Sequence, residues 1–365
     1  MNKSIKNKLI LFVIFFQFTL LCNNVVVSNV YLTNQNVTNH TTQIVFDISW
    51  DNSWRIASGA ANWDAVWIFA KYRVGTGNWQ HAYLSTTSGN HTVTTNNGVP
   101  AAFSVGTTTI SSNQRGMGVF AYRSSNGTGS VNWSGVKLQW NYGENNVADT
   151  AIIDIKIYAI EMVYIPSGSF YVGDGTTNNI RGQLHNANST TTPLLITSEN
   201  SLTLGGTSDG NIGNNNASGM SVADDFNNST TKTLPATFPK GYNAFYCMKY
   251  EMSQEQYMSF LNTLTRTQQN SLVSSNITGT TVTNRYVMSN TSSMSYRNGI
   301  RCDGTLPNTT DPVNFYCDYN GNGTGNESGD GLNIACNFIN WVMGSAFADW
   351  SGLRPMTELE FEKVC

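Results

Sequence analysis

Charged side chains are scarce in this sequence. Only 12% of its 365 residues are Asp, Glu, Lys or Arg, and the formal net charge is −3, whereas about 25% of the residues of an average globular protein are charged. No cluster of lysines and arginines follows the N-terminal segment. Because a nucleic-acid-binding surface needs clustered cations to replace the counterions of the phosphates, the sequence excludes nucleic acid as a partner.

Long apolar runs are also missing, except at the start of the chain. Three lysines precede an apolar run over residues 9–21, which has the length of a signal-peptide core and is too short to span a membrane. We therefore expect a signal peptide over residues 1–28, a secreted or cell-surface protein (periplasmic or extracellular), and no transmembrane span. Two alternatives stay open: lipidation of Cys22, against which the bulky leucines before it argue, and an uncleaved N-terminal anchor.

The sequence lacks the paired cysteine and histidine spacings of zinc sites. Four histidines are scattered in polar stretches, where we expect surface positions: His40, His81, His91 and His185. Removal of Cys22 with the signal peptide leaves five cysteines. Because an exported protein can form disulfides, we expect Cys302 and Cys317, which bracket a short loop, to form a pair.

Asn, Thr, Ser and Gly replace the missing charges, a composition typical of exported, turn-rich β proteins. Alternation with a period of two places four apolar residues on one face of a strand: Ile44, Phe46, Ile48 and Trp50. Similar runs occupy residues 65–72, 118–122, 136–142 and 152–159. Because helical periodicity is missing here, we predict an all-β sandwich of the immunoglobulin or fibronectin type over residues 29–160.

Five tryptophans lie in the first part of this region: Trp50, Trp54, Trp63, Trp67 and Trp79. Carbohydrate rings pack on indole faces, so such a cluster can form a sugar-stacking platform. Tryptophans at alternating strand positions more often fill the core of a sandwich, and we favour that interpretation for this group.

Helical signals appear only in the last third of the chain. Ser253 and Gln256 form a capping box, and Asn340 can cap a second helix that Gly352 ends. A third helix begins at Thr357 and has about two turns before the sequence stops. A helix cut this short has no partner packing, so we expect the sequence to be a fragment.

Three separated segments resemble the formylglycine-generating enzyme (sulfatase-modifying factor) family. They are M-V-Y-I-P-S-G-S-F-Y-V-G at 162–173, F-Y-C-M-K-Y-E-M-S at 245–253, and the stretch at 340–362 that contains A-F-A-D-W-S-G-L-R-P-M-T-E-L-E-F-E. The resemblance implies that residues 161–365 are a C-terminally truncated module with an irregular α+β fold related to C-type lectins. Its polar insertions, at 174–235 and 265–335, are longer than is usual in the family.

The resemblance also implies a chemistry. Enzymes of this family use molecular oxygen and a copper-binding cysteine pair to convert a sulfatase cysteine into formylglycine, and relatives oxidise other sulfur substrates with non-haem iron; thiolate is a suitable ligand for Cu(I). The family's catalytic cysteines lie in its C-terminal half, so no catalytic or cofactor-binding residue is carried over to this chain. For the matched residues we expect structural roles, such as an ion pair of Arg354 with Glu358 or Glu360.

One motif imitates the start of a calcium-binding loop. Asp318, Asn320 and Asn322 supply oxygen side chains at alternate positions, and a glycine follows at the sixth position. The twelfth position is Gly329 where a bidentate glutamate is wanted, although acidic residues lie on either side. A calcium site at these three residues and an Asn/Gly-rich surface turn are both compatible with this pattern.

Two functions are compatible with these features. The first is an exported, oxygen-dependent oxidoreductase that acts on a protein cysteine or another sulfur substrate. The second is a non-catalytic cell-surface binding or adhesion protein that uses the lectin-related scaffold, with a protein, a peptide or a surface glycan as its partner. The low charge and the appended sandwich favour the second function, and the missing cysteine pair predicts that the chain as given is inactive.

Overall fold

The computed structural model describes residues 24–175, 183–189, 191–214, 226 and 229–365. Strands dominate these residues, and every α-helix among them follows residue 253. This confirms a mostly β structure with late helices. The expected signal peptide, residues 1–28, lies largely outside the described residues, although Val26–Ser28 belong to the first strand.

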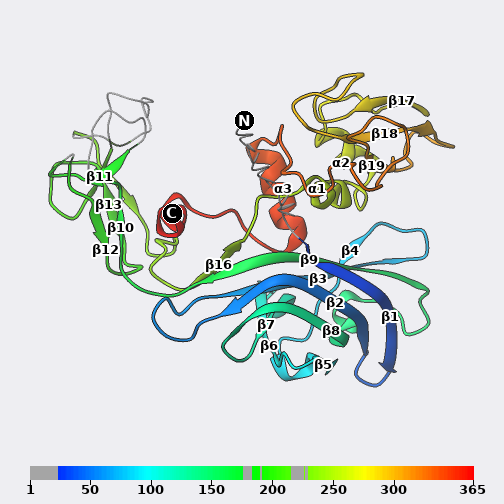
Figure 1. Cartoon of the computed structure of the whole chain (residues 1–365), viewed down its shortest axis with the longest axis horizontal. Helices are drawn as coiled ribbons and strands as arrows, with labels where there is room; N and C mark the ends of the chain where they lie inside the picture. Colours follow the sequence, from blue (N-terminus) through cyan, green and yellow to red (C-terminus); the bar gives the residue numbers. More distant parts are fainter. Residues whose placement is uncertain (1–23, 176–182, 190, 215–225, 227–228) are drawn as a thin grey trace, which may run out of the picture.

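The largest sheet contains the strands of the N-terminal region and one later strand. They are β1 (Val26–Asn36), β2 (Thr41–Arg55), β3 (Trp63–Val74), β4 (Gln80–His81), β5 (Thr92–Thr95), β6 (Ala101–Ile110), β7 (Asn113–Arg123), β8 (Gly127–Trp140), β9 (Ile153–Ile165) and β16 (Phe245–Met248). The order β16-β9-β3-β2-β8-β5 forms its main path, and β7 pairs with both β3 and β6. The sheet curls into two layers around one core (Figure 1).

The inward side chains of β2 alternate as the sequence predicts. Ile44, Phe46, Ile48 and Trp50 are all at most 2% exposed and pack in this core together with Trp133. Trp50 and Trp133 meet edge to face, with ring centroids 5.1 Å apart. The sandwich core therefore rests on period-two burial of large side chains.

Strand β3 is buried on both faces. Its even-numbered side chains, such as Val66 and Ile68, point into the sandwich core, whereas Trp67 and Phe69 point into a second core on the outer face of the sheet. Gly106 and Gly118 lie beneath Trp67, and a Cβ atom at either glycine would come within 2.6 Å of the indole. These two glycines create the hollow that receives the indole ring.

Strand β9 joins the N-terminal region to the rest of the chain. It pairs with β3 from Trp63↔Tyr164 to Val74↔Ile153 without a register shift. β16 then pairs with the end of β9, from Phe245↔Ile165 to Met248↔Met162. The expected boundary between residues 160 and 161 thus falls inside a continuous strand, and the two regions share one sheet.

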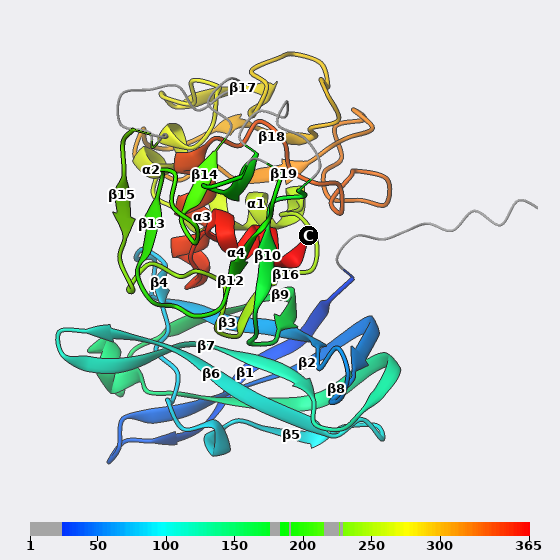
Figure 2. The same ribbon diagram turned by 90° about the vertical axis from the view of Figure 1, so that its left-hand side faces the viewer.

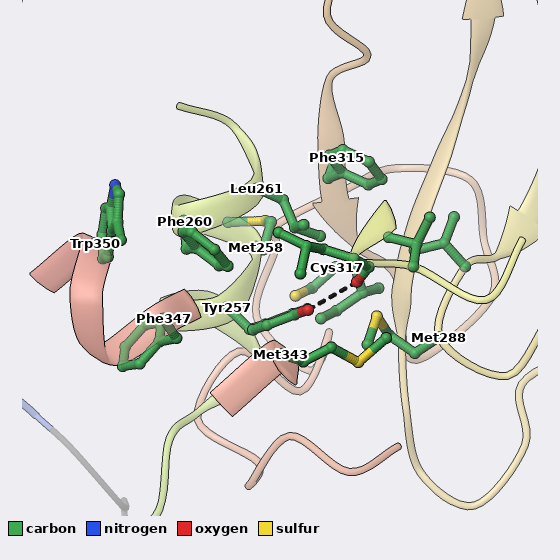
Figure 3. Close-up of a cluster of buried hydrophobic side chains, with 14 of the residues drawn as sticks. Tyr257, Met258, Phe260, Leu261, Met288, Phe315, Cys317, Met343, Phe347 and Trp350 are labelled. Atoms are coloured by element: carbon green, nitrogen blue, oxygen red, sulfur yellow. Dashed lines mark hydrogen bonds between the residues drawn. The ribbon is translucent and has the colours of Figure 1, made fainter. Parts of the chain in front are cut away.

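The second core lies between this sheet and the helices. Its remaining elements are α1 (Gln254–Leu261), α2 (Arg266–Ser271), β17 (Thr281–Tyr286), β18 (Ile300–Thr305), β19 (Phe315–Cys317) and α3 (Trp341–Ser351). Figure 3 shows Phe347 and Trp350 of α3 near Phe260 of α1, with Phe315 and Cys317 of β19 to the right of them. The stretch 265–335 was expected to be a polar insertion, yet it supplies a large share of this core.

Short strands between β9 and β16 surround a third, smaller core. They are β10 (Phe170–Val172), β11 (Leu184–Asn186), β12 (Leu194–Ile196), β13 (Leu202–Leu204), β14 (Ile212–Asn214) and β15 (Lys232–Leu234). Leu359 of α4 (Glu358–Val364) packs into this core. Figure 2 shows these strands and the helices together on one side of the sandwich.

The predicted helix starts are confirmed. Ser253 and Thr357 each begin a capping box, and the side chain of Asn340 accepts a hydrogen bond from the backbone N–H of Met343. Gly352 ends α3 in the left-handed conformation, at φ 73°. A further capping box at Thr265, which begins α2, was not predicted from the sequence.

A buried lysine lies between the sandwich and α3. Lys71 of β3 is 6% exposed, and its Nζ lies 3.0 Å from Nδ1 of His81 and 5.4 Å from the ring of Trp350. Nε2 of His81 donates to the carbonyl of Met117 at 2.6 Å, so Nδ1 is free to accept from the lysine. Burial lowers the pKa of Lys71 to about 7, although Asp349 opposes this shift.

The buried lysine predicts a pH-dependent stability. Between pH 7 and the ordinary pKa of 10.5, the unfolded chain binds a proton at Lys71 that the folded chain does not hold. The free energy of unfolding therefore rises with pH across this window, by at most about 1.4 kcal/mol per pH unit from this group. We expect Lys71→Met to stabilise the protein at pH 7 and to remove this slope.

Urea unfolding at several pH values between 7 and 10 measures both effects. Lys137→Met, which removes one positive charge from a half-buried position on β8, is the control. A wild-type slope that persists in Lys71→Met would contradict the assignment.

Candidate functional site

A groove with a volume of about 690 Å³ lies between β16, α3 and the segment that connects α3 to α4. Most of its lining is apolar and comes from the segments that carry the family resemblance. The residues that line it are Phe120, Met162, Phe245, Tyr246, Cys247, Met248, Met252, Asn340, Trp341, Gly344, Ser345, Phe347, Ala348, Ser351, Leu353, Arg354, Pro355, Met356 and Glu360.

Aromatic stacking holds the sheet side of the groove in place. The rings of Phe120 and Tyr246 lie parallel, with centroids 3.8 Å apart and an interplanar angle of 9°. Trp63 stacks on Tyr164 with the same centroid separation, and its Nε1 donates to the hydroxyl of Tyr246 at 3.3 Å. This wall is therefore rigid and carries few polar groups.

The helix side of the groove combines a small residue with an exposed tryptophan. Gly344 faces the groove from α3, and a Cβ atom there would make only one ordinary contact, with Ile339 at 3.7 Å. Trp341, in the first turn of α3, is 74% exposed at the rim. Because α3 presents no side chain at position 344, the groove stays open beside the exposed indole of Trp341.

An ion pair lies among the residues that line the groove. Both terminal nitrogens of Arg354 donate to the carboxylate of Glu360, at 2.7 and 2.5 Å, and the backbone N–H of Thr357 donates to it at 2.9 Å. Burial opposes ionisation of Glu360, but these hydrogen bonds outweigh it and hold its pKa below the ordinary value. Of the two partners predicted for Arg354, the structure selects Glu360.

The groove offers little for acid–base or redox chemistry. Its lining has one thiol, Cys247, whose pKa is raised by burial, and one carboxylate, Glu360, which is already paired. Histidine does not occur among the residues that line it. Within the described ranges, no group of three or more His, Cys, Asp or Glu side chains could hold a metal ion. A copper or iron centre of the family type does not fit these residues.

The expected disulfide is not formed. Cys302 and Cys317 are both free and fully buried. In the β18–β19 ladder, Cys317 pairs with Ile300 and Cys302 pairs with Phe315, so the two cysteines are diagonal neighbours. Diagonal positions lie about 7–8 Å apart, beyond the separation that a disulfide usually bridges. Burial raises the pKa of both thiols, that of Cys302 to about 12.

The expectation of surface histidines holds only for His40, which is exposed. His91 and His185 are at most 3% exposed, and each has a ring nitrogen that bonds a backbone carbonyl, of Ser85 and Asn186 respectively. Burial lowers the pKa of His91 and lowers that of His81 to about 3. These rings fill space between strands and loops. The polar residues around them in the sequence give no sign of this burial.

The five tryptophans of the sandwich separate into two groups. Trp50 and Trp67 are 1% exposed and belong to the two large cores, as the core interpretation predicts. Trp54, Trp63 and Trp79 are half-buried. The guanidinium of Arg55 lies 4.2 Å from the ring of Trp63, and Tyr164 stacks on the same ring. Because these two side chains cover the indole, Trp63 does not offer a free face for stacking a sugar.

The predicted calcium ligands come together in one loop after β19. Asp318 is fully buried against Arg301, whereas Asn320 and Asn322 are at the surface. The side-chain amides of both asparagines donate to Glu327. The structure therefore gathers the three residues in one closed loop, and calcium binding there stays a prediction.

The ion pair of Arg354 and Glu360 gives a test of local stability. Replacing Glu360 by Gln removes the charged acceptor, so we expect Glu360→Gln to cost about 2 kcal/mol at pH 7. Because the folded-state pKa of Glu360 is lowered, its contribution is present above the ordinary pKa and is lost as the pH falls through the lowered value. Glu358→Gln, on the exposed side of the same helix turn, should cost less than about 1 kcal/mol.

Chemical denaturation of the three proteins at pH 7 and pH 3 measures these differences. Equal losses for the two variants would rule out the role of Glu360.

No helix in the described part of the chain is both long and apolar enough to cross a membrane. Comparison of the chain with protein families, with curated proteins and with solved structures finds no match.

Proposed function

We propose that this chain is an exported, non-catalytic binding protein that holds an apolar or aromatic side chain of a peptide or protein in the groove beside α3. The proposal includes a secreted or cell-surface location, an immunoglobulin-like or fibronectin-like sandwich, and a module of the formylglycine-generating enzyme type over residues 161–365. The observation that carries it is the largely apolar groove, which is lined by the very segments that resemble the family.

The shape and chemistry of the groove favour binding over catalysis. A volume of about 690 Å³ lies in the usual range of ligand sites, and an apolar lining with a few polar groups is typical of them. The paired Arg354 and Glu360 supply polar groups to its lining, and Trp341 supplies an aromatic surface at the rim. Exposed tryptophans beside apolar pockets are typical of interface residues with large contributions to affinity.

The oxidoreductase function remains the rival proposal. It requires a pair of thiolates or another metal-binding set near the substrate, and Cys247 is the one thiol that lines the groove. Among the described residues that line the groove there is no second thiol, and the one carboxylate is paired with Arg354, so the binding function is supported by more of these residues.

Filling the groove tests the binding proposal. Gly344→Phe places a ring in the groove from α3, whereas Gly344→Ala adds one methyl group that makes an ordinary contact. We expect a peptide selected against the wild type from a displayed library to bind Gly344→Phe at least tenfold more weakly. Its affinity for Gly344→Ala should be unchanged, and this variant should be more stable by about 0.5–1 kcal/mol because alanine is the better helix former. Equal affinity for all three proteins would refute the groove as the binding site.

A separate measurement addresses the rival. After incubation with copper and oxygen, we expect mass spectrometry to show that a sulfatase-motif peptide keeps its cysteine unmodified. Conversion of the cysteine to an aldehyde would overturn the non-catalytic assignment.

A further inference from the structure

Asn24, which precedes β1, is bound to a buried carboxylate. Its backbone nitrogen donates to Oε1 of Glu161 on β9 at 2.9 Å. The side chain of Glu161 is 1% exposed, and its Oε2 lies 3.0 Å from Nζ of Lys249. The side chain of Asn24 donates to the carboxylate of Asp51 at 2.9 Å and accepts from the backbone N–H of Asp51 at 3.2 Å. Three hydrogen bonds therefore hold Asn24 with its backbone nitrogen directed at Glu161.

The segment 25–28 is part of the sandwich. Its last three residues pair with β2, and two of its valines pack against the sandwich core. A signal peptide that ended at Ser28 would remove these contacts and would leave Oε1 of Glu161 without the donor that Asn24 supplies. Because a buried carboxylate oxygen without a donor is costly, the contacts favour a leader that ends before Asn24.

Two buried carboxylates share one cation at this place. The ion pairs that Asp64 and Glu161 form with described residues both involve Lys249, at 3.8 and 3.0 Å. Burial raises the pKa of Asp64, although hydrogen bonds from Ser53 and Trp50 and the charge of Lys249 oppose this shift. A second positive charge beside Glu161 would therefore lower the cost of burying the two acids.

We propose that the chain is processed to begin at Asn24, and that the new α-ammonium group of Asn24 forms an ion pair with Glu161. Processing hydrolyses the bond between Asn23 and Asn24: water adds to the carbonyl carbon of Asn23, the C–N bond breaks, and the released amine takes up a proton. A free α-amino group is protonated near neutral pH, and opposite charges attract more strongly in a site shielded from water. The proposal rests on the export of the chain and is independent of what the groove binds.

The residues before Asn24 indicate two cuts. A signal peptidase prefers small residues at the last and the third-last position of the leader, where this sequence has Asn23 and Leu21. A first cut further upstream, followed by an aminopeptidase that removes the remaining residues one at a time, produces the same end. Trimming stops at Asn24 because its amino group is bound to Glu161 and the residues after it belong to the sandwich.

N-terminal sequencing and intact-mass measurement of the exported protein test the position of the cut. The full chain is expressed from Met1 in a bacterial secretion host, and we expect Asn24 to be the first residue of the exported product. An exported protein that begins at another residue, such as Asn29, or that carries a lipid on Cys22 would overturn this inference and leave the export intact. Full-length chain retained in the cytoplasm would refute the export as well.

Two proteins with defined first residues test the ion pair. After release from a cleavable carrier, one begins at Asn24 and the other at Asn23, which keeps the backbone N–H of Asn24 and removes its charge. We expect the form that begins at Asn24 to have a Tm higher by about 2 °C at pH 7. Glu161→Gln should abolish this difference, whereas Asp51→Asn, at an exposed position beside the Asn24 side chain, should keep it. Equal Tm values for the two wild-type forms would overturn the ion pair, and this comparison needs no substitution in the buried site.

Discussion

The pairing of β9 with β3 is the constraint on which the rest of the structure depends. One uninterrupted ladder places the outer face of the sandwich under α1 and α3, so Trp67 and Phe69 become core residues of the second region. The indole N–H of Trp67 donates to the carbonyl of Ser351 at 2.8 Å, which fixes the end of α3 on the sheet. β16 extends the same sheet and forms one wall of the groove. The sheet that begins in the N-terminal region therefore also forms one wall of the groove.

Buried charges reinforce this junction. Nζ of Lys249, just after β16, lies 3.0 Å from the carboxylate of Glu161 on β9 and 3.8 Å from that of Asp64 on β3. Elsewhere, Nζ of Lys363 donates to the carbonyls of Pro166 and Gly241. Nζ of Lys240 likewise donates to the carbonyls of Pro235 and Phe238, in the turn that precedes it. Although the chain has few charged residues, several of them therefore lie in its interior. Their hydrogen bonds to carboxylates and backbone carbonyls fix the positions of the neighbouring backbone.

Local patterns predicted local structure well. The alternation of Ile44 to Trp50 and the capping residues Ser253, Asn340 and Thr357 act over a few residues, so the sequence alone reveals them. The buried histidines, the diagonal offset of Cys302 and Cys317, and the burial of Lys71 depend on strands that are distant in sequence. The groove is another feature that depends on distant segments. In the sequence alone, each apolar residue that lines it is indistinguishable from a core residue, and the groove forms only where β16 and α3 lie side by side.

The hollow formed by Gly106 and Gly118 has an evolutionary consequence. The two glycines pair across β6 and β7, and their missing side chains give the indole of Trp67 the space it needs to reach Ser351. A methyl group on either glycine would lift the ring and shift α3 away from the sheet. Positions 67, 106 and 118 should therefore vary together in homologues, with a smaller residue at 67 wherever either glycine is replaced. The residues at these three positions determine how closely α3 can approach the sheet.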